Sequence, residues 1–251
     1  MDTPDRSAQL EQSPPSTGRP RISTLTLLML LSMMVMAAVF SLWPGLDLAV
    51  SALFWDPGID GFVGDHLPLI HAMYGIIPPL SAFIIVTLIL AFIASQFDRS
   101  ANGRQRRIYC AYLVVVLALG PGLVIDVVLK DYWGRARPAK ITTFGGNATF
   151  SAALLPSDQC NTNCSFVSGH ASAGFFFVSL GFLGGRAARL RWTLIGLALG
   201  GIAGLGRITQ GGHFLSDVIF SFYCTWFSAW LVWVVFQHFG CLRDTVKKPQ
   251  Q

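Results

Sequence analysis

The stretch GRITQGGHFLSD, residues 206–217, brings an arginine, a histidine and an aspartate close together. If a helix begins near His213, Asp217 lies one turn further on and shares its face. A carboxylate in that position can hold an imidazole in one tautomer, and Arg207 can bind an anion beside it. This combination suits nucleophilic catalysis on an anionic substrate, although the same residue types also form ordinary salt bridges at helix ends.

A second cluster of chemically capable residues is KDYWGRARP, residues 130–138. Lys130 and Arg137 are seven positions apart and could converge on one phosphate, the lysine as a point charge and the arginine as a bidentate fork. The alternative is that both side chains reach toward lipid headgroups. Asp126 lies one turn before Lys130, and we expect it to pair with that lysine rather than to catalyse.

A third cluster, Ser168-Gly169-His170, directly precedes an apolar run. A helix start offers free backbone N–H groups to an anion, Gly169 allows close approach, and Ser168 can donate its hydroxyl. His170 can transfer a proton. The alternative is a serine N-cap followed by a histidine at the membrane interface.

Apolar residues dominate this chain of 251 residues: 53% are hydrophobic and only 12% are charged. A soluble domain carries about 25% charged residues. Several apolar runs approach the roughly 20 residues that a helix needs to cross the hydrocarbon core of a bilayer. We therefore expect an all-α polytopic membrane protein with six transmembrane helices, at residues 22–43, 69–95, 108–130, 169–185, 192–206 and 214–239.

Six spans place both termini on the same side of the membrane. Thirteen of the eighteen lysines and arginines lie in the two tails and in two expected loops, 99–107 and 186–191. The positive-inside rule assigns that side to the cytoplasm. Topology then explains the net charge of +5, so we expect no nucleic-acid partner. The other five basic residues lie on the outer side, where the three clusters meet at the ends of helices 3–6: Lys130, Arg135, Arg137, Lys140 and Arg207.

One membrane domain, residues 21–240 with its motif core at 130–217, is expected between a disordered cytoplasmic tail (1–20) and a short cytoplasmic tail (241–251). The aromatic, turn-rich stretch 44–68 suits the membrane interface. In the fifth span, glycines recur every four residues and allow helix backbones to pack closely. These glycines are Gly196, Gly200 and Gly204.

The two cysteines Cys160 and Cys164 lie on the outer side in this topology, where an oxidising compartment permits a disulfide. Two free thiols are the alternative. The sequence contains no CxxC pair of the zinc-binding kind and no acidic cluster suited to magnesium. We expect no metal site.

The motifs K-x6-R-P, S-G-H and R-x5-H-x3-D, in this order and separated by helices, resemble the three signature motifs of the type 2 phosphatidic acid phosphatase superfamily. The resemblance implies that His213 attacks phosphorus to form a phosphohistidine and that Asp217 orients it. It implies that His170 protonates the leaving oxygen. It further implies a phosphate cradle without a metal or other cofactor, formed by Lys130, Arg137, Ser168, Gly169 and Arg207.

Two positions depart from the family pattern: Val167 stands where proline usually precedes S-G-H, and Gly206 where serine often precedes the arginine. Neither change removes a functional group, so we expect the chemistry to survive. Residues 44–62 and 160–170 are similar to those of bacterial lipid phosphatases that act at the outer face of the inner membrane. The second run is most similar to that of lipid A phosphatases, in which valine replaces the proline.

The resemblance therefore implies a bacterial inner-membrane enzyme whose active site faces the periplasm and whose partners are a phosphorylated lipid and the bilayer. No obligate protein partner is evident. Lipid A is the expected substrate, with phosphatidylglycerophosphate or undecaprenyl diphosphate as alternatives. A lipid phosphotransferase would use the same nucleophile and stays open. A non-catalytic binder or transporter of anionic lipids is the alternative of another class.

Overall fold

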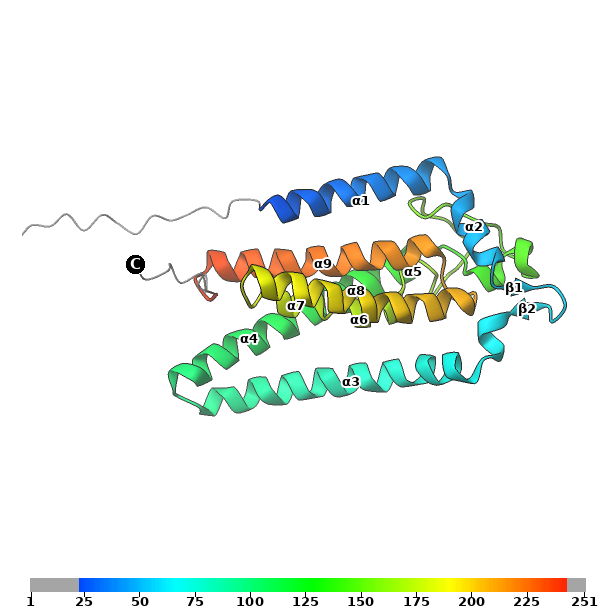
Figure 1. The fold of residues 1–251 in the computed structure, drawn as a ribbon. Helices are drawn as coiled ribbons and strands as arrows, with labels where there is room; N and C mark the ends of the chain where they lie inside the picture. Colours follow the sequence, from blue (N-terminus) through cyan, green and yellow to red (C-terminus); the bar gives the residue numbers. More distant parts are fainter. Residues whose placement is uncertain (1–22, 243–251) are drawn as a thin grey trace, which may run out of the picture.

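The computed structural model describes residues 23–242, which form a bundle of long, roughly aligned helices (Figure 1). The expected tail at 1–20, the first residue of the expected first span, and residues 243–251 of the C-terminal tail lie outside the described residues. The fold class is confirmed as a mostly helical membrane protein, because five helical runs are long and apolar enough to cross a bilayer. These runs are α1 (Thr24–Leu42), α3 (Pro68–Phe97), Ala101–Tyr132, α8 (Arg186–Thr209) and α9 (Leu215–His238).

The expected fourth span is not one helix. It consists of two short helices, α6 (Gly169–Phe175) and α7 (Val178–Gly181), joined by turns. Both pack against α8 and α9. Small residues bring the backbones so close that a Cβ atom on Gly174 would lie 2.4 Å from the backbone nitrogen of Gly200. Hydropathy identified the apolar run, but packing against its neighbours determines its shape.

The prediction of two basic loops is wrong, because most of their residues belong to helices. Residues 101–107 form the first turns of α4 (Ala101–Leu117), where Ser100 caps the helix by accepting a hydrogen bond from the Gly103 N–H group at 3.0 Å. Residues 186–191 form the start of α8. Arginine and alanine are good helix formers, so the helix continues beyond the part of the run that hydropathy marks.

The run Ala101–Tyr132 is helical throughout but contains a wider helical segment. It comprises α4, a π-helical segment η2 (Ala118–Leu129) and the short α5 (Lys130–Tyr132). Pro121 lies inside η2 and has no N–H to donate, so an ordinary α-helical turn is disfavoured there. Lys130 follows η2 directly and begins α5. This short helix lies at the end of the bundle that is covered by the short elements described below (Figure 1).

The regularly spaced glycines of α8 pack as expected. A Cβ atom on Gly196 or Gly204 would lie 2.6 Å or 2.3 Å from a valine side chain of the neighbouring helices. A Cβ atom on Gly200 would lie 2.2 Å from the ring of Phe175 in α6. Because α6 fits against this glycine face, the histidine at its start is held beside the end of α8.

Short elements cover one end of the bundle. They are α2 (Gly45–Ala52), the antiparallel pair β1 (Trp55–Asp56) and β2 (Gly61–Phe62), and the 3₁₀ turns η1 (Val63–His66), η3 (Pro138–Lys140) and η4 (Thr142–Phe144). In Figure 1, α2, α5, β1 and β2 lie at this end, and the start of α1 and the end of α9 lie at the opposite one. The rings of Phe62 and Phe144 are 5.4 Å apart, and Phe214 packs in the same buried cluster. This aromatic cluster holds the covering loops over the start of α9.

Candidate active site

His213 lies in the turn between α8 and α9, two residues before the helix begins at Leu215. The turn depends on glycines: Gly211 has φ +61°, and a Cβ atom on Gly212 would lie 2.1 Å from the guanidinium of Arg207. The His213 side chain is only 2% exposed. Its Nδ1 atom lies 2.7 Å from the carbonyl oxygen of Ser165, which requires Nδ1 to carry the proton. The lone pair is therefore on Nε2.

Asp217 contacts His213 less directly than the spacing predicted. The closest carboxylate oxygen lies 3.7 Å from Nδ1, an electrostatic contact rather than a hydrogen bond. The same oxygen accepts hydrogen bonds from the Ser165 hydroxyl at 2.5 Å and the Phe214 N–H group at 2.8 Å. Ser165 thus connects the two residues, because its carbonyl orients His213 while its hydroxyl binds Asp217.

Two arginines of the expected cradle are held by side chains outside the motifs. Arg207 donates to the Gln210 side chain at 2.6 Å, and its guanidinium lies 4.5 Å from the centre of the Tyr74 ring. Its buried Nε atom has no hydrogen-bond partner among the described residues. Arg137 donates through Nη2 to the carbonyl and the side-chain oxygen of Asn163, at 2.9 Å and 2.8 Å.

Lys130 pairs with Asp126, as expected, with 2.5 Å between Nζ and the carboxylate. A Cβ atom on Gly169 would lie 2.4 Å from the same Nζ atom. The glycine of the S-G-H motif therefore leaves room for the lysine of the first motif. The two motifs meet here although they are far apart in the sequence.

His170 and Ser168 lie at the start of α6. The His170 ring stacks on Tyr74 with 4.7 Å between ring centroids, and its buried Nε2 atom has no hydrogen-bond partner in residues 23–242. The Ser168 hydroxyl accepts from the Ala171 N–H group at 3.4 Å, so the serine acts as the N-cap. The capping alternative for this serine is therefore observed, while His170 keeps a free nitrogen in the site.

All eight residues expected in the site lie in one cluster. His170 lies within electrostatic range of Arg207, His213 and Lys130, and His213 within range of Asp217, Arg207 and Arg137. Burial is the main cause that lowers the pKa of His213 to about 4; Asp217 opposes this shift, and Arg207 and Arg137 contribute to it. His213 is therefore neutral at pH 7, with an Nε2 lone pair available for attack.

The structure adds residues that sequence reasoning did not assign. Tyr74 of α3 contacts both His170 and Arg207, and no motif in its helix signals this. Arg135 had one signal, because it is a basic residue on the outer side. Asp47 had only its place in the turn-rich stretch 44–68. Arg135 bridges Asp47 and Asp217 and is completely buried.

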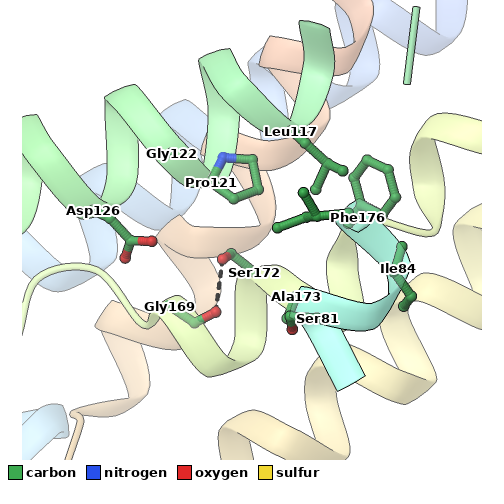
Figure 2. Close-up of a pocket in the computed structure, with 11 residues that line it drawn as sticks. Ser81, Ile84, Leu117, Pro121, Gly122, Asp126, Gly169, Ser172, Ala173 and Phe176 are labelled. Atoms are coloured by element: carbon green, nitrogen blue, oxygen red, sulfur yellow. Dashed lines mark hydrogen bonds between the residues drawn. The ribbon is translucent and has the colours of Figure 1, made fainter. Parts of the chain in front are cut away.

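Two apolar grooves are lined by residues of α3 and α6. The first has a volume of about 180 Å³. In Figure 2, Asp126 and Gly169 mark one end of it, and Leu117, Ile84 and Phe176 the other. The second has a volume of about 390 Å³ and includes His170. Both grooves thus begin at residues of the candidate site and continue along apolar side chains.

A disulfide joins Cys160 and Cys164, with 5.6 Å between their Cα atoms, so the bonded alternative is the one observed. The loop it closes carries Asn163, the partner of Arg137. Among residues 23–242, no group of three or more His, Cys, Asp or Glu side chains is placed to hold a metal ion.

Residues 108–241 match the family model described as the PAP2 superfamily. The chain belongs to the PAP2 superfamily. The three motifs lie inside the matched segment, whereas Asp47 and Tyr74 lie outside it. No solved structure matches this PAP2 protein significantly.

Three curated relatives support a lipid phosphatase within this superfamily. The chain is similar to the lipid A 4'-phosphatase of Francisella tularensis subsp. novicida (strain U112), at 33% identity over 78% of this chain and 88% of the relative. It is similar to the lipid A 4'-phosphatases of Rhizobium leguminosarum and Rhizobium etli, each at 31% identity over 72% of this chain and 83% or 75% of the relative. The protein is therefore a membrane-embedded bacterial PAP2 lipid phosphatase.

Proposed function

We propose that this PAP2 protein removes a phosphate group from the headgroup of lipid A through a phosphohistidine intermediate on His213. The observation that carries the proposal is the hydrogen bond from Nδ1 of His213 to the Ser165 carbonyl. This bond fixes the tautomer in which Nε2 of His213 carries a free lone pair. His213 is also in electrostatic contact with Arg207, Arg137 and His170. A neutral, oriented imidazole beside cations is suited to attack a phosphate ester.

The reaction proceeds in two displacements. Nε2 of His213 bonds to phosphorus while the bond between phosphorus and the lipid oxygen breaks, and His170 gives a proton to that oxygen. Water then attacks the phosphohistidine, His170 takes the proton from that water, and inorganic phosphate leaves with His213 restored. His170 suits both steps because its buried Nε2 atom is unpaired among the described residues.

Fixed positive charge supports the transfer step in this proposal. Lys130, Arg137 and Arg207 are the cations of the cluster, and Ser168 and Gly169 complete the cradle that the motifs imply. Phosphoryl transfer requires mainly positioning and stabilisation of negative charge, which fixed cations in a partly dry site can supply. We therefore propose metal-independent hydrolysis, which activity in EDTA would test.

The choice of lipid A rests on the three relatives with that activity and on the grooves. A phosphate held at His170 and Gly169 would place the acyl chains of a lipid beside the two apolar grooves, which begin at these residues. The chains would then stay within the apolar part of the membrane while the phosphate reaches the cations. This arrangement suits a substrate that never leaves the bilayer.

We also propose the topology that follows from the charges. The five long helices, together with the interrupted segment α6–α7, would make six crossings in the single domain 21–240, with motif core 130–217. Both termini and the basic helix starts near residues 104 and 186 would face the cytoplasm. The site at the opposite end of the bundle would face the periplasm of the inner membrane.

This mechanism predicts the direction of the pH dependence. His213 attacks only when neutral, so the rate should be lost as the pH falls through about 4. His170 must carry the proton that it gives to the leaving oxygen, so the rate should also fall at higher pH, and the profile should be bell-shaped. The acid limb of kcat/KM should therefore lie well below that of an exposed histidine, at about 6.5. Phosphate release measured from pH 3.5 to 8 would locate it.

The deciding experiment measures phosphate release by purified protein from lipid A, phosphatidylglycerophosphate, undecaprenyl diphosphate and phosphatidic acid, with and without an acceptor lipid. We expect release from lipid A to be fastest, to need no acceptor lipid, and to fall at least about 10³-fold in His213→Ala. Wild-type release by His213→Ala would overturn the mechanism. Preference for another lipid would overturn the substrate, and transfer to the acceptor would identify a phosphotransferase.

A further inference from the structure

Three charged side chains lie buried in a row beneath His213. The exposed fraction of Asp47 is 1%, and those of Arg135 and Asp217 are 0%. Arg135 lies between the two carboxylates: its Nη2 atom is 2.8 Å from Asp47 and its Nη1 atom 2.5 Å from Asp217. The row connects helix α2 to the start of α9.

Every polar group in this row has a partner. Arg135 also donates through Nε to the Ser151 carbonyl at 3.0 Å, and its guanidinium lies 4.2 Å from the centre of the Phe214 ring. One oxygen of Asp47 accepts from the Ser216 N–H group at 2.9 Å, and the other from the Ser216 hydroxyl at 2.5 Å. Because both carboxylate oxygens accept hydrogen bonds, Asp47 is bound as the anion.

The charge state of Asp47 depends on its neighbours. Burial raises the pKa of its carboxyl, and the Arg135 guanidinium opposes that rise. A buried charge without a partner is strongly destabilising, so Asp47 requires Arg135. Without the charge of Asp47, Arg135 would still pair with Asp217, and the charge of Asp217 would then be fully balanced by the guanidinium.

The row of two carboxylates and one guanidinium carries a net charge of −1. With Arg135 and Asp217 alone, the net charge beneath His213 would be zero. His213 becomes positively charged when Nε2 bonds to phosphorus, and Arg207, Arg137 and His170 face it from the other elements of the site. The net negative charge of the row opposes these positive charges at His213 through Asp217, whose carboxylate lies 3.7 Å from Nδ1.

We propose that Asp47 is a positioning residue that acts through Arg135: it balances the guanidinium so that Asp217 stays in place and its charge remains available to stabilise the positive charge on His213. This inference rests on the proposed role of His213 as nucleophile. Asp47 would not touch the substrate. Its contribution would appear in the rate of the chemical step and not in binding.

The N-terminal part of the chain would then complete the site. Asp47 lies outside residues 108–241, the segment that matches the PAP2 family model, and 169 residues separate it from its partner Ser216. Helix α2 packs against α9. Asp47 in the segment before the matched region would therefore help to position the catalytic residues.

The test compares Asp47→Asn with the wild type, with Ser51→Ala as the matched control one turn further along α2. Asparagine keeps the shape of the side chain but removes its charge. We expect kcat on lipid A to fall roughly 10- to 100-fold, the range typical of residues that orient a catalytic group, with KM within about twofold. Loss of negative charge disfavours the imidazolium, so the acid limb should move to lower pH. Ser51→Ala should change none of these.

The double variant Asp47→Asn/Asp217→Asn decides whether Asp47 acts through Asp217. We expect the double variant to be no slower than Asp217→Asn alone. Once Asp217 has lost its charge, the change at Asp47 has no carboxylate left to position. The inference would be overturned if the kcat losses of the two single variants multiplied in the double variant. It would also be overturned if Asp47→Asn kept the wild-type kcat or changed only KM. Wild-type activity of His213→Ala in the same assay would instead overturn the proposed function.

Discussion

The residues around His213 form two groups that are built in different ways, here called the closed side and the open side. On the closed side, Ser165, Asp217, Arg135 and Asp47 form a row in which the donors and acceptors are matched. On the open side, nitrogen atoms of His170 and Arg207 are buried without a hydrogen-bond partner in the described part of the chain. The closed side suits permanent contacts, and the open side suits a ligand that must arrive and leave.

This difference has an energetic meaning. A buried donor without a partner costs about 1–3 kcal/mol, so a folded protein retains such groups only where another requirement outweighs that cost. A bound phosphate supplies acceptors for these donors and compensates the concentrated positive charge. The open side is therefore expected to be less stable without ligand than the closed side, and more sensitive to the nature of the ligand.

The largest effect should come from removing a cation on the open side. We expect Arg207→Ala to lower kcat/KM about 10²- to 10³-fold, because a fixed donor to the transferring phosphoryl group is lost. Arg207→Lys should recover only part of this, since a lysine lacks the planar fork. The thermal midpoint should change little, because the loss of an unpaired buried Nε atom and of crowded positive charge offsets the loss of the contacts with Gln210 and Tyr74. A clear drop in the midpoint with little loss of activity would assign Arg207 to the closed, structural side.

The comparison also separates what sequence could predict from what it could not. The open side consists of motif residues, and their types and spacing marked His170 and Arg207, together with His213, as candidates without a structure. Apolar runs likewise predicted the five long helical runs of the described residues, because the length of a membrane helix is set by the thickness of the bilayer. These predictions depend on local information.

On the closed side, only Asp217 was predicted in this way, from its spacing to His213. Asp47, Arg135 and Ser165 come from three separate segments, and no local spacing links them. The same reason explains the broken fourth span, because α6 and α7 take their shape from the glycine face of α8. Contacts between distant segments decide both features. The two basic stretches have a local cause instead, because helix propensity continued there beyond the hydropathy signal.

An intermediate effect should come from the grooves that lead to the open side. Ala173 lines both grooves, and a bulky side chain there would occupy the space proposed for acyl chains. We expect Ala173→Trp to raise KM for a long-chain lipid about 15-fold, which corresponds to displacing two methylene groups at about 0.8 kcal/mol each. A short-chain phosphate ester should be unaffected. Ala82 lies on α3 and lines neither groove, so Ala82→Trp serves as the control. It should leave KM unchanged for both the long-chain lipid and the short-chain ester.

The smallest effect should come from the disulfide loop at the edge of the open side. In Cys160→Ser/Cys164→Ser the loop loses its covalent closure, and Asn163 holds Arg137 less firmly. We expect kcat/KM to fall about two- to fivefold, the equivalent of weakening one hydrogen bond to a charged group by roughly 0.5–1 kcal/mol. The acid limb of the pH profile should not move, because the closed side of His213 contains no residue of this loop. Adding the same two changes to Arg137→Ala should then have no further effect, whereas an equal loss in that background would show that the loop acts on another residue.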